Sequence, residues 1–103
     1  MPSYSFHPDA LAEYSHATTY YRRRGGPLVA AAFVGEVESG IAKILQQPET
    51  WRVAEQPDIR RYSLRRYPYA IYYQWRSDVD AVTVYAIMNL RRQPGYWLER
   101  LRD

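Results

Sequence analysis

The sequence has no cysteine, a single lysine (Lys43) and only two histidines, His7 and His16. Without cysteine the chain cannot form a disulfide scaffold, a thiol nucleophile or a thiolate metal site. Two histidines are too few for a histidine-rich metal centre, so we expect neither a metal nor a cofactor. No apolar run reaches the ~18 residues that a membrane span needs, and no basic-then-apolar leader marks a signal peptide. We therefore expect a cytoplasmic protein with no membrane partner.

Arginine accounts for thirteen of the fourteen basic residues, and there are eleven tyrosines. Residues 1–50 hold four basic and five acidic residues, whereas residues 51–103 hold ten and six. Five arginines and no acidic residue lie between Ile59 and Arg76. Because the guanidinium fork binds oxyanions through two parallel hydrogen bonds, this clustering predicts a partner with phosphate or carboxylate groups. A GC-rich genome explains the ratio of arginine to lysine, but it does not explain the clustering.

The chain of 103 residues has room for one domain, which we expect to span residues 1–103. Residues 3–6 alternate polar and aromatic side chains, which predicts a short strand. A helix then begins at Pro8, with His7 as its cap, and ends at Arg24 before a Gly-Gly pair. Pro27 begins a second amphipathic helix that ends before Pro48. So short a turn between two helices predicts an antiparallel helix hairpin.

The second half of the chain predicts a sheet. Residues 48–58 form a loop in which Trp51 holds the hairpin onto the sheet. Three strands follow, over Ile59–Leu64, Tyr69–Trp75 and Val79–Met88, and residues 96–101 form one or two helical turns. The predicted fold class is α+β, with the order β-α-α-β-β-β, a short C-terminal helix, and the helix hairpin packed on one face of a small antiparallel sheet.

Strand alternation predicts which sheet face stays open. We assign Val82, Val84 and Ala86 to the face that the helices cover. The opposite face is then free of helices, and it presents Arg61, Ser63, Ala70, Tyr72, Thr83 and Tyr85, with Arg65, Arg66, Arg91 and Arg92 at its rim. Such a face can form a groove for a polyanion or an extended peptide. The alternative is a solvated polar face without a ligand.

Few patterns in the chain indicate catalysis. The chain has no glycine-rich phosphate loop, and Glu36 and Glu38 lie on different faces of a helix. Arginine can stabilise a transition-state phosphorane and tyrosine can transfer a proton, so the arginine–tyrosine face could support metal-independent RNA cleavage by the 2′-OH group. In the segment after the last strand we expect Trp97 to pack, and Arg91 and Tyr96 to be available to a partner.

The order of several short motifs resembles the RelE/ParE superfamily of bacterial type II toxin–antitoxin toxins, also known as plasmid-stabilisation proteins. The resemblance extends over nearly the full length of the chain and agrees with the fold derived above. The motifs are Phe6-His7-Pro8-Asp9-Ala10-Leu11-Ala12-Glu13, Tyr20-Tyr21, Pro48 with Trp51, Ile59-Arg60-Arg61-Tyr62, Tyr67-Pro68-Tyr69-Ala70-Ile71-Tyr72-Tyr73 and Asn89-Leu90-Arg91-Arg92-Gln93-Pro94-Gly95-Tyr96-Trp97.

This resemblance implies one of two activities. RelE-like members are ribosome-dependent mRNA endonucleases that use basic residues on the exposed sheet face with a late arginine and an aromatic residue. ParE-like members lack that set and inhibit DNA gyrase. Arg61 and Arg91 match the nuclease pattern, and Tyr96 or Trp97 matches its aromatic residue, but Ser63 and Ala70 stand where it has basic residues. The ParE-like activity is therefore preferred, the RelE-like nuclease is the alternative, and a non-toxic binding module is a third possibility.

The resemblance also implies a partner. Antitoxins of this superfamily commonly wrap an acidic, disordered segment around the toxin, so we expect growth inhibition that a cognate antitoxin silences in a hetero-oligomer. The target would be DNA gyrase or, in the alternative, the ribosome and mRNA. The candidate target-binding residues are Arg61, Arg65, Arg66, Arg91, Arg92 and Tyr96; no metal ligand is among them.

Overall fold

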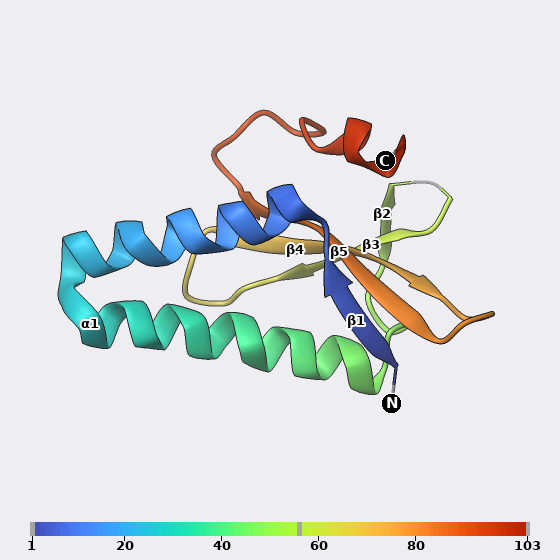
Figure 1. Cartoon of the computed structure of the whole chain (residues 1–103), viewed down its shortest axis with the longest axis horizontal. Helices are drawn as coiled ribbons and strands as arrows, with labels where there is room; N and C mark the ends of the chain where they lie inside the picture. The colour runs from blue at the N-terminus through green and yellow to red at the C-terminus, as the bar shows by residue number, and fades with distance from the viewer. Residues whose placement is uncertain (1, 56, 103) are drawn as a thin grey trace.

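A computed structural model describes residues 2–55 and 57–102 of the chain. It contains one long helical segment, a five-stranded sheet and a short 3-10 helix near the C-terminus (Figure 1). In chain order the elements are β1 (Ser3–Phe6), α1 (Pro8–Gln46), β2 (Val53–Glu55), β3 (Ile59–Ser63), β4 (Tyr69–Arg76), β5 (Ala81–Asn89) and η1 (Leu98–Arg102).

The element α1 contains both predicted helices and folds back on itself. Gly26 interrupts it with non-helical backbone angles, φ +86° and ψ 179°, and Pro27 follows directly. The N-terminal arm, residues 8–25, and the C-terminal arm, residues 27–46, run side by side in opposite directions (Figure 1). The cap is as predicted, because His7 Nδ1 accepts the Asp9 N–H at 3.1 Å. The predicted hairpin is therefore confirmed. No helix in the described part of the chain is long and apolar enough to cross a membrane.

The sheet has the strand order β1-β5-β4-β3-β2. The pairs β2–β3, β3–β4 and β4–β5 are antiparallel, whereas β1 pairs with β5 in parallel. The predicted fold class is confirmed, and the structure adds two details. The parallel β1 makes the sheet mixed, and the strand β2 lies within the segment predicted as a loop, because three residues are too short to show a pattern.

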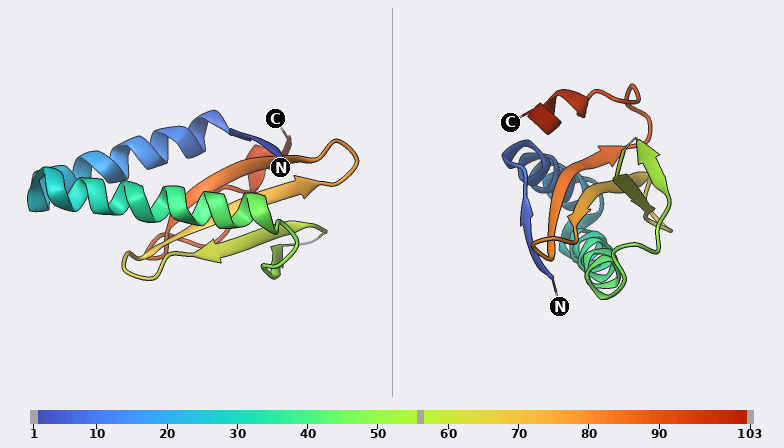
Figure 2. Two further views of the ribbon diagram at one scale, coloured as in Figure 1. Left: turned by 90° about the horizontal axis from the view of Figure 1, so that it is seen from below. Right: turned by 90° about the vertical axis from the view of Figure 1, so that its right-hand side faces the viewer.

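The helix hairpin covers one face of the sheet and forms the main core (Figure 2). Trp51 packs edge-on against Tyr62 with ring centroids 5.1 Å apart, as predicted for the loop that joins the hairpin to the sheet. Arg60 Nη1 donates to the carbonyl oxygen of Trp51 at 2.6 Å and holds this loop in place. Among the buried residues of this core are Phe33, Val37, Ile41, Ile44, Leu64, Ile71, Tyr73, Val82 and Val84.

The prediction that the opposite face is open is wrong over its centre. The segment after β5 crosses this face, and the Trp97 ring lies on the Tyr72 ring with centroids 4.7 Å apart. Ala70 and Tyr72 are consequently buried in a second apolar cluster, with Leu98 and Leu101 packed against it. The reason is that a sheet face rich in Ala, Met and Tyr is itself apolar and has to be covered. Arg61 is only half-buried and Ser63 is exposed.

A β-bulge in β5 explains a second difference. Tyr72 pairs with Ala86 but Tyr73 pairs with Val84, so Tyr85 is an extra residue on β5. Beyond the bulge the alternation of side chains is reversed. Ala86 therefore lies in the cluster with Trp97, not on the helix-covered face where strict alternation placed it.

Candidate functional site

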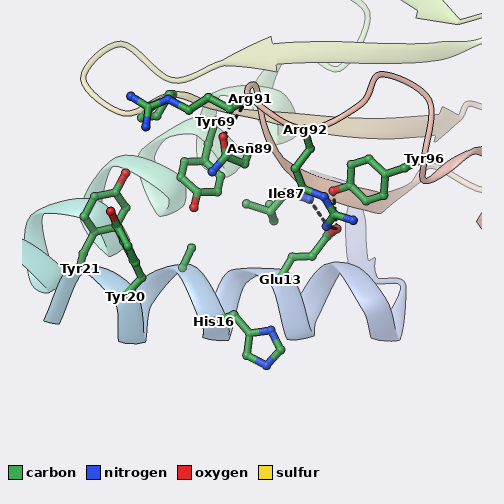
Figure 3. Close-up of a pocket in the computed structure, with 12 residues that line it drawn as sticks. Glu13, His16, Tyr20, Tyr21, Tyr69, Ile87, Asn89, Arg91, Arg92 and Tyr96 are labelled. Carbon is green, nitrogen blue, oxygen red and sulfur yellow. Dashed lines mark hydrogen bonds and ion pairs between the residues drawn. The ribbon is translucent and has the colours of Figure 1, made fainter. Parts of the chain in front are cut away.

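A pocket of about 500 Å³ opens between the N-terminal arm of α1, the end of β5 and the segment after β5 (Figure 3). We call it the tyrosine–arginine pocket. Its floor includes Tyr21, Tyr69 and Ile87, and its rim includes Asn89, Arg91 and Arg92. The site therefore joins a helix, a strand end and a connecting segment that are far apart in the sequence.

The floor of the pocket is aromatic and uncharged. The rings of Tyr21 and Tyr69 meet edge to face with centroids 6.2 Å apart, and Tyr21 also packs on Phe33 at 4.9 Å. Burial raises the pKa of both Tyr21 and Tyr69 above the ordinary value, although the nearby Arg91 acts in the opposite direction on each. Both phenols therefore stay protonated at neutral pH, so this part of the floor carries no charge.

The rim of the pocket is cationic. A turn after β5 sets its geometry: the Leu90 N–H donates to the Pro68 carbonyl oxygen at 2.8 Å, and the Arg91 N–H donates to Asn89 Oδ1 at 2.9 Å. The Arg91 side chain is exposed and forms no ion pair with any acidic residue that the structure describes. An exposed guanidinium beside an aromatic floor suits a ligand that combines an apolar or planar group with a carboxylate or phosphate.

One wall of the pocket is built on Glu13, whose side chain is only 13% exposed. Its carboxylate accepts the Ile87 N–H at 3.1 Å, the Tyr96 hydroxyl, and both terminal nitrogens of Arg100 at 2.9 and 3.0 Å. Arg92 Nη1 lies 3.7 Å from the same carboxylate. Four groups from β5 and the C-terminal segment thus converge on one acidic residue of α1.

Tyr96 is held firmly by this arrangement. Two guanidinium groups lie over its ring, with the Arg92 Cζ 3.8 Å and the Arg100 Cζ 5.2 Å from the ring centroid. Burial, and then the hydrogen bond to Glu13, raise the pKa of Tyr96 well above its ordinary value. We expected Tyr96 to be available to a partner. It does line the pocket, but its hydroxyl is protonated and already donates to Glu13.

The other predicted site residues lie elsewhere. Arg61 is on β3 opposite Tyr72, and β4 separates its strand from β5, so it is not part of the tyrosine–arginine pocket. Arg65 and Arg66 follow β3 in the turn to β4, where Glu36 Oε1 accepts their backbone N–H groups at 2.6 and 2.9 Å. Their side chains are exposed and border a separate hollow with Lys43. Of the six candidate target-binding residues, only Arg91, Arg92 and Tyr96 line the tyrosine–arginine pocket.

Sequence reasoning missed Glu13 and Arg100. Glu13 had a signal, because it lies on the inward stripe of the first helix with Ala10 and Ala17, where an acidic residue needs a buried partner. Arg100 had none, because nothing local distinguishes it from the other arginines. In the described ranges, 2–55 and 57–102, no group of three or more His, Asp or Glu residues could hold a metal ion.

Comparison with known proteins identifies the family. The family model described as the ParE toxin of the type II toxin–antitoxin system parDE matches residues 4–94. No curated protein sequence shows significant similarity to the chain.

Several solved structures share the fold, among them the following three. The chromosomal ParDE system from P. aeruginosa matches with a TM-score of 0.72 and 22% identity, over 88% of this chain and 98% of that chain. The isolated E. coli RelE toxin matches with a TM-score of 0.63 and 21% identity, over 99% and 98%. The intact E. coli RelBE toxin–antitoxin complex matches with a TM-score of 0.64 and 20% identity, over 89% and 100%. Because the family model matches most of its length, the chain belongs to the ParE toxins of type II toxin–antitoxin systems, within the RelE/ParE superfamily.

Proposed function

We propose that this toxin inhibits DNA gyrase and that a cognate antitoxin neutralises it in a hetero-oligomeric complex. The proposal rests first on the family, because the ParE-like members of the superfamily are the ones that act on gyrase. It rests secondly on the bonding of Tyr96. Its hydroxyl donates to Glu13, and its raised pKa keeps the phenol protonated, so Tyr96 is poorly suited to act as the general base of a nuclease.

The separation of the nuclease residues supports the same choice. A metal-independent endonuclease needs several groups around one scissile phosphate, and Arg61, Arg91 and Tyr96 are the candidates. Arg61 is not among the residues that line the pocket with Arg91 and Tyr96. Each missing oxyanion stabiliser is expected to lower the rate by about 10² or more. A toxin that only binds its target does not need these groups around one phosphate.

Arg91 and Arg92 are the residues that we assign to target binding. Their side chains are exposed at the rim of the pocket, next to an aromatic floor. A complex of gyrase with DNA offers both carboxylates and phosphates to such guanidinium groups. The tyrosines beneath them can pack against an apolar side chain or a planar group of the target.

The antitoxin is expected to be acidic, because the toxin carries a formal net charge of +3. The outer strands of the sheet, β1 and β2, each have one edge with no neighbouring strand among the described residues, so an extended antitoxin segment could also pair with the backbone there. A stable complex should bury more than about 1,200 Å² in total. Affinity purification of the tagged toxin together with its native operon should recover a small acidic protein, and recovery of none would contradict this part.

Induced expression and a supercoiling assay together test the target. A gyrase inhibitor should cause filamentation and a DNA-damage response, and the purified toxin should block DNA supercoiling by purified gyrase. Codon-aligned mRNA cleavage detected by primer extension would instead support the ribosome-dependent endonuclease. Normal growth at full expression would support a binding module without toxicity.

A further inference from the structure

The parallel pairing of β1 with β5 ends before β5 does. The last pair is Phe6 with Val84, and the His7 N–H donates to the Val84 carbonyl oxygen at 2.8 Å. There the chain turns into α1, so within residues 2–55 and 57–102 no strand continues along this edge of β5. Unpaired backbone groups at a sheet edge have to be satisfied or they invite pairing with another chain.

Two side chains take the place of the missing strand. Arg100 Nη1 donates to the Tyr85 carbonyl oxygen at 2.9 Å, and Glu13 Oε1 accepts the Ile87 N–H at 3.1 Å. Glu13 and Arg100 also bind each other through two hydrogen bonds, 2.9 and 3.0 Å long. Both side chains are largely buried, 13% and 11% exposed, so this charge-assisted pair is among the stronger polar contacts available to a protein.

The same carboxylate controls the segment that carries the pocket rim. Within residues 90–102, Tyr96 and Arg100 donate to Glu13 and Arg92 lies within ion-pair distance of it. The only other ion pair from this segment to α1 in the described part of the chain is Arg100 with the exposed Asp9, at 3.8 Å. Neutralising Glu13 would therefore weaken three anchors together, because all three depend on one charge.

We propose that Glu13 is a positioning residue that fixes segment 90–102 on α1 and the edge of β5, and so holds Arg91 and Arg92 at the rim of the tyrosine–arginine pocket. The proposal rests on the proposed function in one respect, namely that the rim binds the target. Although Glu13 borders the pocket, its side chain is only 13% exposed and its hydrogen bonds are made within the chain, so it acts through the residues that it holds.

Glu38 provides a matched control on the same helical element. Glu38 Oε2 also accepts a tyrosine hydroxyl, from Tyr14 at 2.7 Å, but among the described residues no hydrogen bond or ion pair joins it to segment 90–102. We therefore compare Glu13→Gln with Glu38→Gln, which make the same chemical change. Glu13→Asp keeps the charge but shortens the side chain, and it serves as the conservative variant.

Hydrogen exchange of the backbone reports on the segment directly. The Leu98 N–H donates to the Gly95 carbonyl oxygen and the Arg100 N–H to the Trp97 carbonyl oxygen, both at 3.0 Å, so these amides report whether η1 is formed. In Glu13→Gln we expect both amides to exchange about tenfold faster or more, with α1 and β4 unchanged, and colony formation under induction to recover. Glu38→Gln should show wild-type amide exchange in η1 and wild-type toxicity. Glu13→Asp should give exchange rates and toxicity between those of the wild type and Glu13→Gln.

Three results would overturn the proposal. The first is wild-type exchange and wild-type toxicity in Glu13→Gln. The second is faster exchange with full toxicity, because the position of the segment would then be irrelevant. The third is equally faster exchange in α1, β4 and η1, which would make Glu13 a general stabilising residue. Exchange does not depend on the target, so a wild-type toxin that fails to inhibit gyrase would end the gyrase proposal but not this one.

Discussion

Arg91 is the residue on which target binding depends most in our proposal. It is exposed, it forms no ion pair with a described acidic residue, and it lies near the floor of the pocket, where it affects the pKa of Tyr21 and Tyr69. Arg91→Ala should lose toxicity while the protein stays folded, because removal of a surface cation changes stability by at most about 0.5 kcal/mol. Colony formation under induction and thermal melting measure the two effects.

The control for Arg91 is Arg23→Ala. Arg23 is exposed on the N-terminal arm of α1 and does not line the tyrosine–arginine pocket. The Arg23→Ala protein should have the melting temperature and the toxicity of the wild type. An Arg91→Ala protein that is folded and fully toxic would contradict the assignment of the rim to target binding.

Arg61 separates the two activities. A gyrase inhibitor that acts through the pocket rim should tolerate Arg61→Ala, because Arg61 lies on β3 and away from the pocket. An endonuclease that uses the sheet face should lose activity. Colony formation with the folded variant decides between them, and a folded, non-toxic Arg61→Ala protein would favour the nuclease.

The buried Tyr73 makes stability depend on alkaline pH. Its hydroxyl donates to the Pro48 carbonyl oxygen at 2.6 Å, and burial raises its pKa from 10 to about 12. Because the folded state favours the protonated phenol, its contribution to stability is complete below pH 10 and is lost as the pH rises towards 12. Urea unfolding at several alkaline pH values should show this loss, and Tyr73→Phe should reduce the slope.

At the scale of the elements, the fold of α1 depends on one backbone conformation. Gly26 has φ +86° and ψ 179°, a region that other residues rarely adopt, and a methyl group there would meet no neighbouring atom. Gly26→Ala should therefore cost about 1–3 kcal/mol through backbone strain alone. Measurement of the free energy of unfolding in urea gives this value directly.

Gly35 is the matched comparison for Gly26. It lies inside the C-terminal arm of α1, is exposed, and would also accommodate a methyl group without contact. Gly35→Ala should stabilise the protein by about 0.5–1 kcal/mol, because alanine loses less backbone freedom in a helix. Equal effects of the two substitutions would mean that the turn at Gly26 is not strained by a side chain.

The elements that sequence predicts best are those with a local cause. The hairpin follows from the Gly-Gly-Pro turn and from helical spacing of Phe33 and Val37, and the long strands follow from their β-branched and aromatic residues. The bulge at Tyr85 has no such local cause, because it depends on how β4 and β5 pair. It places Ala86 on the sheet face opposite to the one that strict alternation predicts. Packing of Trp97 was predicted and is confirmed, but its position over Tyr72 and the contact of Glu13 with Arg100 depend on the complete fold. Three of the six predicted target-binding residues, Arg91, Arg92 and Tyr96, therefore line the pocket, whereas Glu13, which holds their segment, was not predicted.

At the scale of the whole molecule, charge should govern the speed of complex formation. The toxin has a net charge of +3 and the expected antitoxin segment is acidic. The association rate constant should fall as the salt concentration rises, whereas the dissociation rate should change little. Stopped-flow mixing of toxin with its antitoxin at several salt concentrations measures both. A rate that does not change with salt would show that apolar contacts alone guide the encounter.

The contact between Glu13 and Arg100 also has a consequence for protein synthesis. The two residues are 87 positions apart, so the contact cannot form until residue 100 has left the ribosome. The helix hairpin is made early and rests on local contacts, whereas closure of so long a loop comes at the end. A nascent chain therefore carries an incomplete site until residue 100 has emerged. The rim that we assign to target binding is therefore anchored only after the helix hairpin has formed.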